Sequence, residues 1–160
     1  MSNIADFIAQ KLEKNGVSHV FELVGGMSAI LLDAIHATTK IQVVSLHHEQ
    51  AAAFAVDGWS RMAGKPAVGL VTSGPGATNL ITGIASCYFD SVPAIFITGQ
   101  VNRHELRKNK NQRQFGFQET NITEIVKSIT KKTWLAEDES DIESIIDDAF
   151  RISTEGRPGP

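Results

Sequence analysis

The sequence predicts an α/β protein with three layers, in which helices cover both faces of a mostly parallel sheet of about six strands. Short apolar runs alternate along the chain with segments whose apolar residues recur at helical spacing. Several of these runs are nearly free of polar residues, which is typical of strands that are buried on both faces. Because 160 residues is an ordinary domain length, we expect residues 1–160 to form a single domain.

The first elements are predicted from spacing and from glycine breaks. Apolar residues recur at helical intervals over residues 4–12, and Gly16 ends this helix. A short strand is expected over residues 19–23. A pair of glycines then breaks the chain before a second helix, over residues 29–38.

The middle of the chain continues the alternation. Strands are expected over residues 41–46, 67–72 and 93–98, and helices over residues 50–62 and 77–89. The first of these two helices is rich in alanine, which suits close packing against a neighbour. The second follows directly on a Gly-Pro-Gly turn.

The last third of the chain begins with a long polar segment, residues 100–120. A segment of this length inside a compact domain is more often a functional loop than a packing element. We expect a further strand over residues 127–135. Residues 140–143 have the form of a capping box, which predicts the start of a final helix that Gly156 ends.

Composition excludes several classes of protein. With 42% hydrophobic and 21% charged residues the chain is neither disordered nor fibrous, and a net charge of −3 gives no reason to expect a nucleic-acid partner. The single Cys87 cannot form a disulfide within the chain and is expected to pack as a small hydrophobe. Apolar runs are far shorter than the ~20 residues of a membrane helix. We therefore expect a cytoplasmic protein that does not enter a membrane.

Three features follow the first three expected strands. Gly25 and Gly26 follow the first, Glu49 follows the second, and residues 74–76 form a Gly-Pro-Gly turn after the third. Ligands of open parallel sheets bind beyond the carboxyl ends of the strands, and glycines allow the backbone to approach them. A plain structural turn remains an equal alternative for both glycine segments.

Glu49 is the most informative of these residues. A carboxyl group at this position can exchange a proton with a ring nitrogen, whereas the simpler interpretation is a surface glutamate that favours a helix N-terminus. The preceding His47 and His48 point to opposite sides of an extended segment, so we expect no metal site there. The glycine turn does not match a dinucleotide-binding fingerprint, because Asn79 stands where that motif has its last glycine. It does not match a Walker loop either, because Pro75 stands where that motif has lysine.

Six segments stand out as a set: residues 48–53, 57–61, 70–79, 90–93, 98–100 and 117–119. In unchanged order they closely resemble the N-terminal pyrimidine-binding domain of thiamine diphosphate enzymes, and among these acetolactate synthase, also called acetohydroxyacid synthase. The likeness extends over residues 4–160. It implies the thiamine diphosphate-binding fold.

The resemblance also implies a site. The family's motif glutamate, here Glu49, hydrogen-bonds the aminopyrimidine ring and promotes its imino tautomer, so that the cofactor's own amino group deprotonates the thiazolium carbon. The other residues that the resemblance places against the pyrimidine are Gly25, Gly26, Pro75 and Asn79. Phe117 and Gln118 are expected beside the substrate, and Gln118 is expected to take part in catalysis. No metal ligand is implied within this chain.

The implied activity belongs to a longer protein. Family members decarboxylate a 2-keto acid such as pyruvate and add the product to a second keto acid, as in branched-chain amino acid biosynthesis. A C-terminal domain holds the diphosphate and Mg, and the resemblance leaves open whether the full-length protein also uses FAD. The site forms between two subunits of a homo-oligomer. We therefore expect an excised first domain that lacks the central and C-terminal domains and is inactive alone.

Two departures from the family pattern leave alternatives open. Val24 stands where the family usually has proline, and residues 102–116 form a longer and more basic loop than usual. One alternative is a related thiamine diphosphate decarboxylase or transferase with another substrate. Another is an independent module that binds a small molecule or a partner protein.

Overall fold

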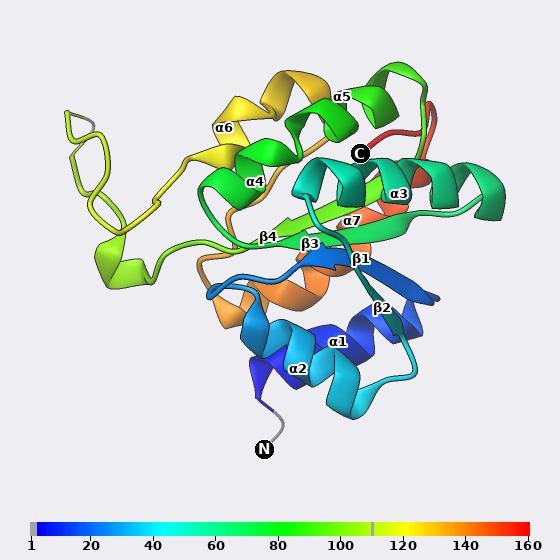
Figure 1. Ribbon diagram of the computed structural model, residues 1–160, viewed down its shortest axis with the longest axis horizontal. Helices are drawn as coiled ribbons and strands as arrows, with labels where there is room; N and C mark the ends of the chain where they lie inside the picture. The colour runs from blue at the N-terminus through cyan, green and yellow to red at the C-terminus, as the bar shows by residue number, and fades with distance from the viewer. Residues whose placement is uncertain (1–2, 110) are drawn as a thin grey trace.

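A computed structural model of the chain describes residues 3–109 and 111–160. Its centre is a sheet of parallel strands in the order β2-β1-β3-β4, with helices on both faces (Figure 1). The strands are β1 (His19–Leu23), β2 (Gln42–Ser45), β3 (Ala67–Val71) and β4 (Ala94–Thr98). The predicted α/β class and its three layers are confirmed.

Seven α-helices and three short 3-10 helices are present in the described part of the chain. The α-helices are α1 (Ile4–Lys14), α2 (Ala29–Thr38), α3 (Glu49–Ala63), α4 (Pro75–Asn79), α5 (Ile81–Phe89), α6 (Ile122–Ile125) and α7 (Ile142–Thr154). The 3-10 helices are η1 (Arg103–Glu105), η2 (Lys127–Ile129) and η3 (Glu139–Asp141). None of the described helices is long and apolar enough to cross a membrane.

The two faces of the sheet have separate apolar cores. Helices α1, α2 and α7 pack on one face, where Leu12 and Ile35 meet Val20 of β1. Helices α3, α5 and α6 cover the other face, where Val56 packs with Phe21. Ile84 belongs to a second apolar cluster on this face. Strand β3 is buried along its whole length. This burial on both faces explains the nearly continuous apolar runs of the sequence.

The expectation of about six strands is wrong for the described structure, whose sheet has four. Residues 127–135 do not form a strand. They begin with η2, and the residues from 132 onward are extended without a paired neighbour. The physical reason is that a strand requires a paired neighbour for its backbone groups, and within the described residues the pairing of β4 is with β3.

Two helix starts also differ from the predictions. The capping box at residues 140–143 does not form, because the side chain of Asp138 accepts hydrogen bonds from the Ser140 amide and hydroxyl, and η3 precedes α7. The helix expected over residues 77–89 begins earlier, with Pro75 in its first turn. It is divided at Leu80, whose amide donates to Ala77 in a tighter three-residue turn.

Candidate functional site

The candidate site lies where β1, β2 and β3 end. Paired residues near these ends are level across the sheet, with Glu22 opposite Ser45 and Leu23 opposite Val71. The segments that follow the three strands therefore meet at one edge of the sheet. This is the edge at which open parallel sheets bind ligands.

Glu49 is the first residue of α3 and is half-buried. The ring Nδ1 of His48 accepts a hydrogen bond from the Gln50 amide at 3.0 Å and so caps the helix. The amide Nδ2 of Asn79, at the end of α4, donates to Glu49 Oε2 at 2.9 Å. No hydrogen bond to Glu49 Oε1 is found within residues 3–109 and 111–160, which leaves that oxygen available to a ligand.

Thr72 joins the glycine segments around Glu49. Its hydroxyl accepts a hydrogen bond from the Met27 amide at 3.3 Å. A Cβ atom on Gly25 would lie 2.5 Å from Thr72 Cβ. A Cβ atom on Gly76 would lie 2.8 Å from Thr72 Cγ2 and 3.3 Å from Glu49 Oε1. Both close approaches require glycine.

Gln118 reaches the same edge of the sheet from the long loop. Gly74 has φ +62°, and a Cβ atom there would lie 2.6 Å from Gln118 Cβ. Gln118 itself has φ 61°, a left-handed conformation that is uncommon for a residue with a side chain. The contact thus places Gln118 against the turn that precedes α4. Phe117 is 79% exposed, and nothing in the structure brings it to Glu49.

The remaining predicted residues lie around this centre. Pro75 begins α4 and is exposed, as are Gly26 and Asn79. A Cβ atom on Gly26 would have no neighbour within 4 Å. The sequence analysis missed Thr72 as a site residue. The feature of the sequence that could have identified Thr72 is its position at the end of the third apolar run, directly before the glycine turn.

The described residues of the loop over residues 100–120 extend from the end of β4 away from the sheet (Figure 1). The carboxylate of Glu119 ties this loop together, because it accepts the amides of Arg107 at 2.9 Å and Phe115 at 2.7 Å. Burial opposes ionisation of Glu119, but these backbone donors outweigh it and hold the pKa of the carboxyl below its usual value. Gln100 donates to the Thr120 carbonyl at 2.9 Å and closes the base of the loop.

Two other groups singled out in the sequence lie outside this arrangement. Cys87 is buried in α5, and burial raises the pKa of its thiol to about 12. Within the part of the chain that the structure describes, no three His, Cys, Asp or Glu side chains gather as a metal ion would require, and His47 and His48 have no such neighbours there.

Comparison with known proteins gives a consistent result. The family model described as "Thiamine pyrophosphate enzyme, N-terminal TPP binding domain" matches residues 2–125. Acetolactate synthase of Arabidopsis thaliana, a chloroplastic protein, is 44% identical over 156 residues, which are 98% of this chain and 22% of that protein. Acetolactate synthase 3 of Brassica napus is 44% identical, and the probable acetolactate synthase 2 of Oryza sativa 43%, over 98% of this chain and 23% of each relative. The chain thus spans less than a quarter of these relatives. It belongs to the family of N-terminal TPP-binding domains of thiamine pyrophosphate enzymes.

Proposed function

We propose that the chain supplies the pyrimidine half of the active site of an acetolactate synthase-like enzyme. The observation that carries the proposal is the arrangement of Glu49, whose carboxylate is held by Asn79 through one oxygen and keeps Oε1 for a ligand. The family supports thiamine diphosphate as that ligand. The relatives, all acetolactate synthases by name, support a 2-keto acid as the substrate.

The chemistry of the residues fits an aminopyrimidine ring. A ring nitrogen is a hydrogen-bond partner for a carboxyl oxygen, and the two exchange a proton readily when they are in contact. Gly76 presents no side chain beside Glu49 Oε1, where a Cβ atom would lie 3.3 Å away. A Cβ atom on Gly26 would meet nothing within 4 Å, so the backbone there is open to a ligand.

Each residue then has a defined role. Glu49 hydrogen-bonds the ring nitrogen through Oε1, and Asn79 fixes the orientation of its carboxyl group through Oε2. Gly25, Gly26 and Pro75 form the backbone wall of the pyrimidine site, and Gln118, which lies against Gly74, faces the substrate. Phe117 is exposed in this chain, and its role beside the substrate stays a prediction. Bound thiamine diphosphate supplies the carbon nucleophile that removes carbon dioxide from the first keto acid and transfers the remaining group to a second.

Part of the proposed active site comes from outside these 160 residues. The diphosphate and its Mg require oxygen ligands from a further domain, and the complete site requires a second subunit, so we expect the 160-residue chain to be inactive alone. An FAD requirement and a cytoplasmic location stay predictions. The relatives are named as chloroplastic proteins, and this location is a statement about them and not about this chain.

A graft tests the activity. The matching 156 residues of the Arabidopsis acetolactate synthase are replaced by those of this chain, and carbon dioxide release from pyruvate is measured with thiamine diphosphate and Mg. The graft is expected to be active. Glu49→Gln is expected to lower the rate by about 100-fold or more, since general acid–base groups contribute about that much.

The matched control is Glu139→Gln, because Glu139 is an exposed glutamate in η3, away from the site. This variant should keep the rate of the graft. An equal rate for the Glu49→Gln graft would contradict the role given to Glu49. A graft that assembles and binds the cofactor but releases no carbon dioxide from pyruvate would contradict the proposed substrate.

A further inference from the structure

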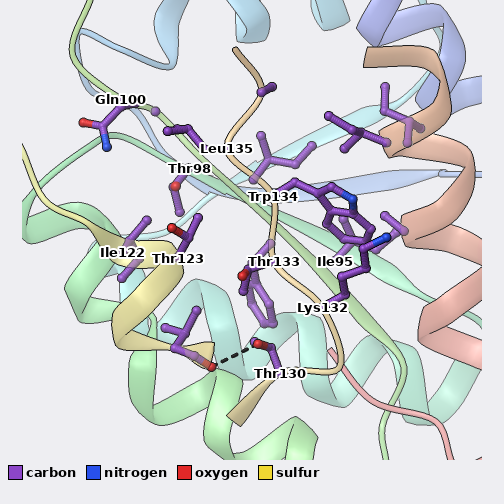
Figure 2. Close-up of a pocket in the computed structure, with 18 of the residues that line it drawn as sticks. Ile95, Thr98, Gln100, Ile122, Thr123, Thr130, Lys132, Thr133, Trp134 and Leu135 are labelled. Atoms are coloured by element: carbon purple, nitrogen blue, oxygen red, sulfur yellow. Dashed lines mark hydrogen bonds between the residues drawn. The ribbon is translucent and has the colours of Figure 1, made fainter. Parts of the chain in front are cut away.

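Two cavities lie at the base of the loop over residues 100–120. The larger, of about 680 Å³, runs along β4 and is lined mainly by apolar side chains, among them Ile95 and Leu135 (Figure 2). The smaller, of about 460 Å³, lies between the loop and α6, and Arg107 and Arg113 are among the residues that line it. All the described residues around the smaller cavity except one are charged or polar. The two cavities therefore suit different kinds of ligand.

The loop is a basic segment of an acidic chain. Residues 100–120 contain five arginines and lysines and two glutamates, whereas the whole chain has a net charge of −3. Both glutamates are hydrogen-bonded within the loop. Glu105 accepts from the Asn102 amide at 3.0 Å, and Glu119 accepts from the Arg107 amide at 2.9 Å. The charge of the loop thus favours an anionic ligand.

The two arginines belong to opposite limbs of the loop, and the backbone holds these limbs together. The Gly116 amide donates to the Glu105 carbonyl at 2.8 Å, and a Cβ atom on Gly116 would lie 2.9 Å from Glu105 Cβ. Arg107 follows Glu105 on one limb, and Arg113 precedes Gly116 on the other. The Arg107 guanidinium also donates to the Gln112 carbonyl at 3.1 Å. Both arginines are therefore brought to one cavity by an ordered backbone.

Two carboxylates also line the cavity, and both have cationic or hydrogen-bonding neighbours. The oxygens of Glu119 accept loop amides, and Arg107 Nε lies 4.0 Å from Glu119 Oε1. Glu124 is exposed, and its Oε1 lies 3.5 Å from Lys127 Nζ. Arg113 is exposed at the cavity and adds a second guanidinium. The carboxylates thus leave the cavity able to attract an anion.

The donors at the cavity match a phosphate group. A guanidinium group presents parallel N–H donors that fit two phosphate oxygens at once. A phosphate monoester carries about two negative charges at pH 7, which Arg107 and Arg113 together balance. Asn121 Oδ1 accepts from the Thr123 hydroxyl at 3.0 Å, so the NH2 group of Asn121 remains a donor at the cavity.

The size of the cavity favours a phosphate ester over a free phosphate ion. Its volume of about 460 Å³ corresponds to roughly 15 water molecules, whereas a phosphate ion has only five heavy atoms. Space is left for an organic group, and Ile125 gives that space an apolar surface. Thr120 of the cavity follows Gln118 by two residues, and Gln118 lies against Gly74 at the strand ends. A ligand in the cavity would thus lie near the candidate site.

We propose that Arg107 and Arg113 bind the phosphate group of a small phosphate ester in this cavity. The charge of the loop, the convergence of its two limbs and the size of the cavity each support this assignment. Phosphate binding here does not depend on the function proposed for Glu49, because the two sets of residues are separate. It is measured without any catalytic activity.

An NMR titration of the ¹⁵N-labelled chain with ribose 5-phosphate tests the proposal, in 0.15 M salt, where weak surface attraction is screened. The Arg113 side-chain N–H and the Asn121 amide should shift and saturate with a Kd on the order of 1 mM. Ribose should cause no such shifts. Arg113→Gln should raise the Kd by at least tenfold, since it removes a charged hydrogen bond, and Arg113→Lys by less.

The matched control is Lys108→Gln, which removes the same charge from an exposed residue of this loop that does not line the cavity. It should change the Kd by less than twofold. Unchanged shifts of the Arg107 and Phe115 amides, which Glu119 holds, will show that each variant keeps the loop folded.

Three results would overturn the proposal. The first is the absence of saturable shifts at Arg113 and Asn121 with ribose 5-phosphate. The second is an equal rise in Kd for Arg113→Gln and Lys108→Gln, because it would mean that only the overall charge of the loop attracts the anion. The third is inorganic phosphate that binds as tightly as the ester, because it would contradict a ligand with an organic group.

Discussion

Asn79 and Glu49 are separated by 30 residues in the chain, yet the Asn79 amide group donates to Glu49 Oε2 at 2.9 Å. The bond joins the end of α4 to the start of α3 and crosses the edge of the sheet where β2 and β3 end. A carboxylate held through one oxygen presents its other oxygen in a fixed direction. This relationship is the physical basis of the role proposed for Glu49.

Replacing Asn79 should weaken catalysis without removing the carboxylate. A hydrogen bond to a charged group contributes about 1.5–3 kcal/mol, so Asn79→Ala in the grafted enzyme is expected to lower the rate by about tenfold or more. Asn79→Asp should lower it further, because a carboxylate cannot donate the hydrogen bond and repels Glu49. Asn109→Ala, in the exposed loop, is the control. An unchanged rate for both Asn79 variants would contradict the orienting role.

The close approach of Gly76 and Thr72 should be detectable in the free energy of unfolding. Gly76→Ala places a methyl group 2.8 Å from Thr72 Cγ2, and overpacking of this kind costs about 1–3 kcal/mol. Thr72→Ser removes Cγ2 and should restore part of the loss in a double-mutant cycle measured by urea unfolding. Gly26→Ala is the matched control, because its methyl group meets nothing within 4 Å, and it should be nearly neutral. Additive effects of the Gly76 and Thr72 changes would show that the close approach is not real.

The loop over residues 100–120 should loosen at acid pH. Despite burial, the Arg107 and Phe115 amides lower the pKa of Glu119, so the ionised carboxylate stabilises the folded loop. The stabilisation is complete above the usual glutamate pKa and is lost as the pH falls through the lowered one. Hydrogen exchange of the Arg107 and Phe115 amides, corrected for intrinsic pH dependence, should show reduced protection over that range. Glu119→Gln should reduce protection at neutral pH and abolish this dependence, whereas Glu124→Gln should do neither.

Cys87 should be unreactive in the folded protein. Burial raises the pKa of its thiol to about 12, so at pH 8 only about one thiol in ten thousand is ionised. An aromatic disulfide reagent at pH 8 should therefore modify the native chain slowly, at a rate that follows local opening, and the urea-unfolded chain rapidly. Rapid modification of the native chain would show that α5 does not bury this side chain.

The sequence predicted well those parts of the fold that depend on local pattern. Four strands and the helices between them follow from apolar spacing. Gly64, which ends α3, has the left-handed conformation that is typical of a glycine at a helix C-terminus. The strand expected over residues 127–135 did not form, because pairing depends on a neighbour that local pattern cannot supply. The capping box at residues 140–143 did not form, because the Ser140 amide donates to the side chain of Asp138, a residue outside the motif.

The candidate site was predictable in part for a similar reason. Glu49 and the glycine segments were found because strand ends in a parallel sheet meet at one edge. The part played by Thr72 depends on two glycines that lie far apart in the sequence, and it becomes visible only when β1 and β3 are adjacent. The contact of Gln118 with Gly74 depends on a left-handed residue in a long loop, and neither periodicity nor composition predicts that conformation.

The most direct test of the account is an NMR titration of the ¹⁵N-labelled 160-residue chain with thiamine diphosphate. Binding to a half-site should be weak but saturable, with the largest shifts at the amides of Gly26, Glu49 and Gly76. These shifts should be lost in Glu49→Gln and retained in Glu139→Gln. Shifts confined to other parts of the chain, or equal shifts in the Glu49→Gln variant, would contradict the claim that Glu49 and the strand-end glycines hold the pyrimidine.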